Sequence, residues 1–228
     1  MGIDEAIMNS VRNGGKSTIR FYKWKPSAVS IGRFQSMEEE VDIEACKSNG
    51  IDYVRRITGG GTVFHSSFGE ITYSVISREE EFKDIMGTYR EICGWIVDAL
   101  YSLGITASFS PINDITVNGK KISGNAQARK GNVMLQHGTI LYDLDPMMFK
   151  VLRVGKEKLS DKGIASPEER VTSVKNFSRA SMDELYRSLL SSFSKGKEYA
   201  IEGLSEKEVE ESKELIEKYA SYSWNFER

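Results

Sequence analysis

The sequence lacks an excess of charge of either sign. Its 31 lysine and arginine residues nearly balance 33 acidic residues, which gives a formal net charge of −2 at pH 7. A protein that holds nucleic acid on a broad basic surface needs an excess of basic residues, so we do not expect a nucleic-acid partner. The balance does allow a local basic patch for a small acidic protein, although the sequence does not locate one.

Long apolar runs are also missing. No run approaches the ~20 residues that a membrane-spanning helix requires. The first residues, Met1 to Glu5, lack the basic and apolar regions of a signal peptide. We therefore expect a cytoplasmic protein without a membrane partner.

Cysteine and histidine are scarce. Cys46 and Cys93 lie far apart and fit reduced thiols of a cytoplasmic protein better than a disulfide or a zinc site. Cys93 falls on the apolar stripe of a predicted helix, which indicates a core position. His65 and His137 are too few for a histidine-rich metal site, and neither lies in a nucleophile-elbow context. The residues alone favour hydrogen-bonded structural roles for both.

The expected helices and strands do not alternate as in a doubly wound parallel sheet. Apolar residues at steps of three and four predict helices over 3–11, 41–48 and 85–103. Capping boxes at Ser181–Glu184 and Ser205–Glu208 mark later helices. Alternating residues predict strands at 18–22, 28–31, 51–56, 62–65, 71–76, 115–117, 121–123 and 133–137, the first two forming a hairpin. This order favours an α+β fold. The four prolines form no linker-like cluster, so we expect one domain over 1–228.

The strongest local signal is RRITGGGTVFH, from Arg55 to His65. Three consecutive glycines, 59–61, leave backbone N–H groups free to approach a ligand, and successive N–H groups form an anion site. Arg55 and Arg56 carry donors suited to phosphate or carboxylate. A flexible hairpin loop beside two solvated arginines explains the same residues equally well. The segment is neither a P-loop nor a dinucleotide-binding fingerprint.

A second signal runs from Asn113 to Gln127. On the predicted strand at 121–123, Lys121 and Ser123 share one face while Lys120 points the other way. One lysine can then enter a pocket and stabilise phosphate while its neighbour stays in solvent. Asp114 offers a carboxylate for Mg²⁺, which takes few protein ligands when phosphate is present. A polar surface hairpin is the simpler alternative, and these residues alone favour it modestly.

Both segments resemble the signature segments of the lipoate–protein ligase A family. The likeness is carried by RRxTGGGxVxH over 55–65 and GKKIxGxA over 119–126. Supporting segments follow in the expected order along nearly the whole chain: IDEA at 3–6, IGRFQ at 31–35, Asn113–Asp114, HGTIL at 137–141 and YSWN at 222–225. The resemblance implies the biotin/lipoate ligase fold, an α+β catalytic domain around a mixed, largely antiparallel sheet.

The resemblance also implies a reaction. Family ligases use ATP and Mg²⁺ to convert lipoate to lipoyl-adenylate, and then lipoylate a lysine of an acceptor domain, such as that of a 2-oxoacid dehydrogenase E2 or the glycine cleavage H protein. The essential lysine is then Lys121. The substrate-binding residues are Arg56, Gly59, Gly60, Gly61, Val63, His65, Gly124, Ala126, His137 and Gly138; the nucleotide-binding residues are Asn113, Asp114, Lys121 and Thr139; Asp114 is the metal ligand.

The chain departs from the family pattern in several places. Ser66 and Glu70 stand where aspartates are usual, which questions any carboxylate role there. Family chains usually carry about one more strand before the first helix, and a missing strand would expose a sheet edge. Many also carry a C-terminal accessory domain, which in some relatives is a separate polypeptide required for activation. We therefore expect either acyl transfer alone or a need for such a partner.

Two other functions are weighed. An octanoyltransferase of the same fold would move octanoate from acyl carrier protein to the same acceptor lysine. Related transferases use a cysteine nucleophile, but residues 107–114 and those after His137 contain no cysteine, which disfavours a thioester intermediate. The other candidate is a non-catalytic lipoyl-binding or scaffold protein. Lys121 and the glycine segment argue weakly against it.

Overall fold

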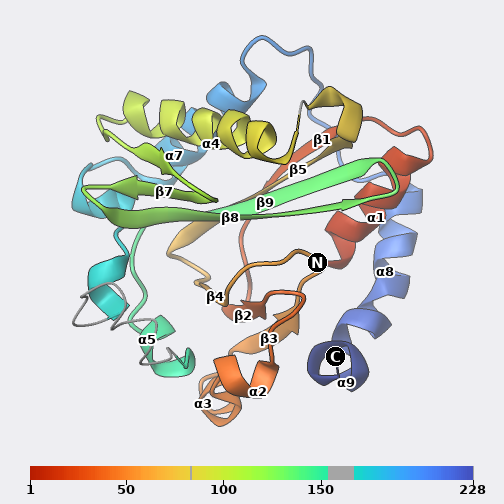
Figure 1. Ribbon diagram of the computed structural model, residues 1–228, viewed down its shortest axis with the longest axis horizontal. Helices are drawn as coiled ribbons and strands as arrows, with labels where there is room; N and C mark the ends of the chain where they lie inside the picture. Colours follow the sequence, from red (N-terminus) through yellow and green to blue (C-terminus); the bar gives the residue numbers. More distant parts are fainter. Residues whose placement is uncertain (83, 154–166, 228) are drawn as a thin grey trace.

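The computed structural model describes residues 1–82, 84–153 and 167–227, and its strands form two sheets (Figure 1). The larger sheet is antiparallel throughout, with six strands in the order β1 (Thr18–Tyr22), β5 (Glu70–Arg78), β9 (Val133–Leu141), β8 (Lys120–Lys130), β7 (Asp114–Val117) and β6 (Ser108–Ser110). The smaller sheet has β2 (Ala28–Ile31) between parallel β3 (Asp52–Arg55) and antiparallel β4 (Val63–His65). The expected α+β fold with a largely antiparallel sheet is confirmed.

Helices pack on both faces of the six-stranded sheet and also beside the three-stranded sheet. They are α1 (Gly2–Arg12), α2 (Met37–Glu40), α3 (Ile43–Ser48), α4 (Ile85–Ser102), α5 (Met148–Val151), α7 (Met182–Ser194), α8 (Glu206–Ala220) and α9 (Tyr222–Phe226), with short 3₁₀ turns at Glu79–Glu81, Pro167–Arg170 and Val174–Asn176. Figure 1 shows α4 and α7 on one face, and α1 with the three-stranded sheet on the other.

The long helix α4 is built as its sequence pattern predicts. Asp84 caps its first turn by accepting a hydrogen bond from the Gly87 N–H. Its apolar stripe, which includes Ile92, Cys93 and Ile96, packs with residues of α7 and of the six-stranded sheet in the largest hydrophobic core. The capping boxes predicted for the starts of α7 and α8 are also present.

The strand partners differ from the sequence prediction. Strands 18–22 and 28–31 do not form a hairpin, because β1 pairs with β5 whereas β2 lies in the other sheet. All four β2 residues are buried, and β2 has a hydrogen-bonded strand on each edge. Nearness in sequence does not decide which strands these partners are. The same arrangement rules out a hairpin at the glycine segment, since β2 lies between β3 and β4.

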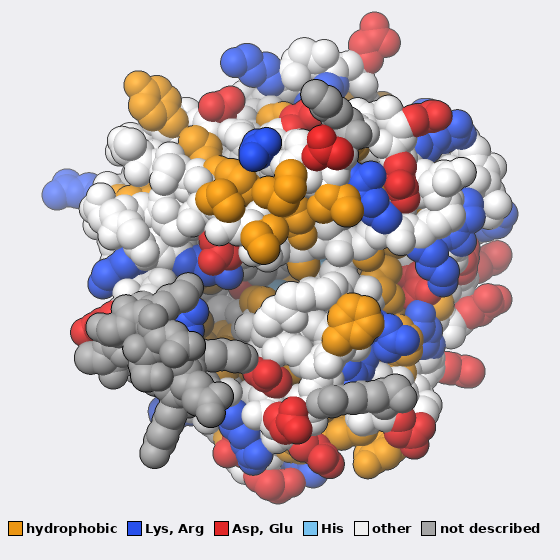
Figure 2. Space-filling model, viewed as in Figure 1, with side chains coloured by type: hydrophobic (Ala, Val, Ile, Leu, Met, Phe, Trp, Pro, Cys, Tyr) orange, Lys and Arg blue, Asp and Glu red, His pale blue; other side chains and the backbone are white. Residues whose placement is uncertain are grey.

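The surface matches the balanced composition. Figure 2 shows basic and acidic side chains interspersed over one face, with a group of hydrophobic side chains near its centre. Within the described residues, no helix is both long and apolar enough to cross a membrane.

Candidate active site

A β-bulge determines which way the Lys121 side chain points. Ile115 and Thr116 are neighbours on β7, yet their partners on β8 are Ser123 and Lys121, so Ile122 is an extra residue. Cross-strand partners share a face of the sheet, and consecutive residues take opposite faces. Lys121 therefore lies on the face opposite Ser123. The prediction that they share a face is wrong, because the extra residue reverses the alternation.

The face that carries Lys121 also carries Asp114 and Gly124. Lys121 Nζ lies 2.6 Å from Asp114 Oδ1, and the two side chains are 39% and 36% exposed. A Cβ at Gly124 would lie 2.6 Å from Lys121 Nζ, so the missing side chain leaves the space that the lysine occupies. Lys120 pairs with Val117 and takes the opposite face, as predicted. The pair is thus an ammonium and a carboxylate that a ligand can reach.

Asp114 was predicted to bind Mg²⁺. Among the described residues, no group of three or more histidine, cysteine or acidic side chains could hold a metal ion. One carboxylate still fits Mg²⁺ when phosphate and water supply the other ligands. A metal contact for Asp114 therefore stays a prediction, and it would require Lys121 to share this carboxylate.

The glycine segment is wrapped around the Arg56 guanidinium, which is buried. Arg56 donates to Thr58 Oγ1 at 3.0 Å, to the Ser30 carbonyl at 3.2 Å, and to the carbonyls of Gly59 and Gly61 at 2.8 and 2.7 Å. Burial lowers the pKa of Arg56 to about 10, so it stays cationic at neutral pH. Because its N–H groups point at protein atoms, Arg56 shapes the loop; its predicted contact with substrate stays a prediction.

The carbonyls of the glycine segment accept hydrogen bonds from Arg56, whereas its amides have no such partner. No hydrogen bond joins the N–H groups of Gly59, Gly60 or Gly61 to another described residue. Gly60 is exposed and has φ +92°, a conformation that glycine adopts readily. Carbonyls drawn toward a cation leave amides available on the other side of the backbone, as an anion site needs.

The loop lies between the two sheets. A Cβ at Gly32, just after β2, would be 2.0 Å from the Gly60 carbonyl oxygen, and a Cβ at Gly60 would be 3.8 Å from that of Ala126 on β8. The Arg33 N–H also donates to the Thr58 carbonyl at 2.8 Å. The glycine loop is therefore fixed by backbone contacts at one end and faces β8 at the other.

Arg55 has a structural role. Its guanidinium is fully buried and donates to the carbonyls of Gln35 at 2.6 Å, Trp224 at 2.8 Å and Asn225 at 2.8 Å. Its own N–H donates to Asn225 Oδ1 at 2.7 Å. The expectation that Arg55 offers these donors to a ligand is wrong, because they hold α9 against β3.

The predicted residues of β9 divide between the two faces of the sheet. His137 and Thr139 pair with Ala126 and Gly124 and share the face of the glycine loop. Gly138 lies on the other face, where a Cβ would be 2.2 Å from Asn125 Oδ1. Gly138 thus has a packing role, and its predicted substrate contact stays a prediction.

Asn113 and Val63 both contact a neighbouring strand. Asn113 accepts from Asn125 Nδ2 at 2.9 Å and donates to the Asn125 carbonyl, which joins the start of β7 to β8. Val63 is half-buried on β4 opposite Ser30. Their predicted contacts with nucleotide and substrate remain predictions.

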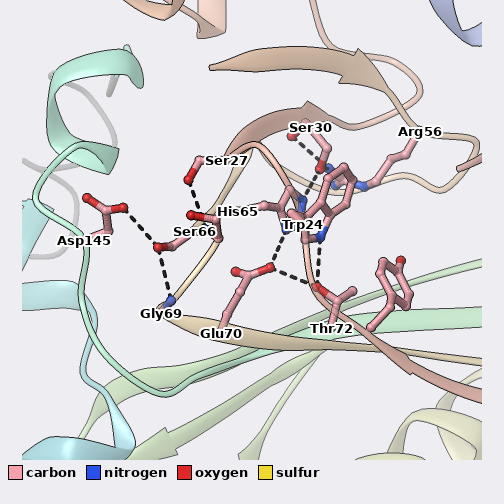
Figure 3. Close-up of polar contacts among 12 residues, drawn as sticks. Trp24, Ser27, Ser30, Arg56, His65, Ser66, Gly69, Glu70, Thr72 and Asp145 are labelled. Carbon is pink, nitrogen blue, oxygen red and sulfur yellow. Dashed lines mark hydrogen bonds and ion pairs between the residues drawn. The ribbon is translucent and has the colours of Figure 1, made fainter. Parts of the chain in front are cut away.

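The two histidines are buried and hydrogen-bonded, as the residues alone predict. His65 lies 2.8 Å from Ser30 Oγ and 2.7 Å from Glu70 Oε1, and stacks on Trp24 (Figure 3). His137 Nε2 lies 2.7 Å from Thr58 Oγ1. Glu70, which stands where an aspartate is usual, therefore places a carboxylate beside His65.

Sequence reasoning missed Asp4. It is 1% exposed on α1, where it contacts Arg20 and lies 3.8 Å from His137 Nδ1. The signal was present, because Asp4 stands one helical turn before buried Ile7 and Met8 on the apolar stripe. An acid on a buried stripe indicates a buried partner.

Two cavities lie away from Lys121. One, of about 270 Å³, contains Arg33 and Ile57 in its lining and gathers further basic side chains there: Arg12, Arg129, Lys130 and Lys218. The other, of about 760 Å³, is lined by residues that include Met1, Trp24 and Tyr53. The first is a local basic patch that the sequence did not locate.

Comparison with known proteins shows the family of the chain. Residues 1–194 match the family described as lipoyl protein ligase A/B catalytic domain. The chain belongs to this family. It is similar to octanoyltransferase LipM of Clostridioides difficile, with 33% identity over 100% of this chain and 94% of that protein. The resemblance to the lipoate–protein ligase A family, which was inferred from the two motifs, is thereby confirmed.

Solved structures of ligases are also similar to the chain. One is the bi-partite lipoate protein ligase of Thermoplasma acidophilum, solved in a study with its E2 lipoyl domain, with TM-score 0.88, 36% identity, and coverage of 99% of this chain and 90% of that one. Another is a lipoate-protein ligase A bound with ATP, with TM-score 0.87, 33% identity, and coverage of 99% and 92%. The chain therefore belongs to an enzyme family of lipoyl transfer.

Proposed function

We propose that the chain is an ATP-dependent lipoate–protein ligase that forms lipoyl-adenylate and transfers the lipoyl group to a lysine of an acceptor domain. The observation that carries the proposal is the placement of Lys121. Its ammonium is half-exposed, lies beside Asp114, and shares a face with Gly124 and Ala126 opposite the glycine loop. Similarity to a ligase bound with ATP supports ATP as the co-substrate.

In the first step, a carboxylate oxygen of lipoate attacks the α-phosphorus of ATP, and pyrophosphate leaves. Two negatively charged groups must approach, so a cation between them lowers the barrier. Lys121 supplies that charge as a flexible point cation. The free amides of Gly59–Gly61 are suited to the phosphate oxygens. Mg²⁺, held through Asp114 and phosphate, would neutralise further charge.

In the second step, the acceptor lysine amine attacks the acyl carbon of the adenylate, and AMP leaves. The mixed anhydride is already activated, so no nucleophile of this chain is required. The cysteines agree with this. Both are fully buried, and burial raises the pKa of Cys46 to about 11 and of Cys93 to about 12, so neither is a thiolate at neutral pH.

An octanoyltransferase is the second candidate, favoured by the 33% identity to octanoyltransferase LipM. In that case octanoate comes from acyl carrier protein and no ATP is consumed. The buried cysteines weigh against a thioester intermediate. A non-catalytic role would require that Lys121 and the open loop serve no reaction.

The partner follows from the same reaction. The study that describes the bi-partite Thermoplasma ligase includes an E2 lipoyl domain. We infer a lipoyl acceptor domain as the substrate of this chain, and a separate accessory polypeptide as a further component of the activation step.

The test is acceptor modification measured by intact mass. Apo acceptor domain is incubated with the chain under three conditions: lipoate with ATP and Mg²⁺, preformed lipoyl-adenylate, and octanoyl carrier protein without ATP. Modification in the first two establishes a complete ligase. Modification with adenylate alone indicates that activation needs the accessory polypeptide. Efficient modification only from octanoyl carrier protein overturns the ligase proposal.

A further inference from the structure

Two buried carboxylates reach Arg56 through a histidine and a hydroxyl group. In the first arm, Glu70 Oε1 lies 2.7 Å from His65 Nδ1, and His65 Nε2 lies 2.8 Å from Ser30 Oγ. Ser30 Oγ in turn accepts from Arg56 Nη1 at 3.3 Å. Figure 3 shows these side chains converging from β5, β4 and β2.

The second arm reaches the same guanidinium at Nε rather than at Nη1. Arg56 Nε donates to Thr58 Oγ1 at 3.0 Å, which lies 2.7 Å from His137 Nε2. His137 Nδ1 lies 3.8 Å from Asp4 Oδ2, a distance for electrostatic attraction rather than a hydrogen bond. The arms therefore share one design, and the Glu70 arm is the tighter of the two.

Neither arm is arranged for nucleophilic catalysis, although a hydroxyl, a histidine and a carboxylate in line suggest a catalytic triad. Ser30 is 1% exposed and Thr58 is fully buried, so a substrate carbonyl cannot reach them. Each hydroxyl also accepts a hydrogen bond from Arg56. The oxygen that would attack is thus already directed at the guanidinium.

The arms instead compensate the buried positive charge of Arg56. Arg56 is a buried cation whose direct partners in the described structure are carbonyls and hydroxyls, and a buried charge is costly unless it is compensated. Glu70 and Asp4 supply negative charge two groups away. Each hydroxyl, polarised by its histidine, becomes a better acceptor for Arg56.

We propose that Asp4 and Glu70 are positioning residues: through His137–Thr58 and His65–Ser30 they orient Arg56, which holds the carbonyls of Gly59 and Gly61 and so keeps the loop amides facing the ligand. Because the amides serve the adenylation step, this inference rests on the proposed ligase function for its effect on activity. Its effect on loop order does not depend on that function.

The protonation of the second arm is consistent with this role. Burial opposes the charge on Asp4, but His137, the N-terminal amine and Arg20 outweigh it and lower the Asp4 pKa. Burial lowers the pKa of His137, more than Asp4 raises it. A neutral His137 can carry its proton on Nδ1, on the side of Asp4, and accept at Nε2 from the Thr58 hydroxyl, so the hydroxyl proton points away from Arg56.

The first experiment is hydrogen exchange of the free chain in the Glu70→Gln and Asp4→Asn variants, read at the Arg33 and Arg56 amides, which donate to the Thr58 and Ile31 carbonyls and so report the order of the loop. Glutamine at position 70 no longer requires a donor at His65 Nδ1, so the order of the hydrogen bonds to Arg56 is lost. We expect exchange at the loop to be about tenfold faster in Glu70→Gln, the equivalent of one charge-assisted hydrogen bond. We expect a smaller increase in Asp4→Asn. Glu44→Gln, at an exposed pair with Lys47, is the matched control.

The second experiment is a double-mutant cycle. Glu70 and Ser30 are linked through His65, so Glu70→Gln and Ser30→Ala should be strongly non-additive in loop exchange, although the two residues do not touch. In the activation reaction, both variants should raise the KM for ATP more than they lower kcat. Additive effects, or loop exchange equal to that of the Glu44→Gln control, would overturn the proposal. If no activation is detected in the unchanged protein, the cycle in loop exchange still decides it.

Discussion

The two signature segments each contain a cation, and the structure treats them differently. Lys121 is 39% exposed and has one carboxylate beside it. Arg56 is 4% exposed, and its donors are committed to carbonyls and hydroxyls of the protein. A charge in a ligand-binding motif therefore acts on the ligand only where a side chain can leave its partner. Where it cannot, the charge acts on the shape of the backbone.

The largest effect should come from the exposed cation. Lys121→Ala removes the charge that the bulge at Ile122 directs toward the loop face of β8, and we expect about 100- to 1000-fold slower adenylate formation, as for removal of one preorganised electrostatic group. The measurement is lipoate-dependent pyrophosphate exchange. Lys120→Ala is the control and should change the rate less than about twofold. Equal losses in the two variants would remove the distinction between the faces.

A substitution that disturbs the loop around buried Arg56 should lower stability more than it changes chemistry at the site. Gly32→Ala places a Cβ 2.0 Å from the Gly60 carbonyl oxygen, a backbone atom that can move only if the loop moves with it. We expect the free energy of unfolding to fall by about 1–3 kcal/mol, as for overpacked positions, with activity lost in proportion to loop displacement. Urea denaturation measures the first and pyrophosphate exchange the second.

The matched glycine on the exposed side should behave in the opposite way. In Gly124→Ala the new Cβ meets the end of the flexible Lys121 side chain at 2.5–2.6 Å. The lysine can rotate away, so stability should change by less than about 0.5 kcal/mol, while adenylate formation falls. A large loss of stability here would show that Lys121 is held as rigidly as Arg56.

Acid should weaken the buried region by a smaller amount. The pKa of His137 is lowered below its ordinary 6.5, so below that pH the unfolded chain binds a proton that the folded chain does not. Stability from this group is complete above pH 6.5 and is lost as the pH falls. We expect about 1 kcal/mol lower free energy of unfolding at pH 5.5 than at pH 7. His137→Gln should abolish this part of the dependence in urea titrations; an unchanged slope would contradict it.

The smallest effect should come from the thiols. Because Cys46 and Cys93 are buried with raised pKa values, they should react slowly with a thiol reagent in the folded chain. The pair of substitutions Cys46→Ala and Cys93→Ala should leave acyl transfer from lipoyl-adenylate within about twofold. Loss of transfer with retained folding, judged by circular dichroism, would favour a thioester mechanism.

The sequence predicted the elements better than their partners. The apolar stripe of 85–103 and the two capping boxes gave helices in the right places because these signals are local. The hairpin of 18–22 with 28–31 was wrong because the choice of sheet is a long-range matter. The face of Lys121 relative to Ser123 was wrong because a one-residue bulge leaves no mark in residue spacing.

The structure bears on the candidate site only through which residues it brings together. Lys121 and Asp114 were expected together and are together, since neighbouring strands carry them. The role of Arg56 could not be read from its type, because a guanidinium suits a carbonyl as well as a phosphate. Asp4 was noted only as part of the IDEA segment, and its burial against Arg20 needed the tertiary structure.

The contacts of Arg55 constrain the order in which parts of the chain can fold during synthesis. Its carbonyl partners include Trp224 and Asn225, about 170 positions later in the chain. A nascent chain is made from its N-terminus, so an early residue cannot contact a late residue until the late residue has been synthesised. Until α9 has been synthesised and docked, Arg55 can reach the Gln35 carbonyl but not the carbonyls of Trp224 and Asn225. The contacts of Arg55 in the RRITGGG segment can thus be completed only after Trp224 and Asn225 have been translated, although the segment lies in the first third of the sequence.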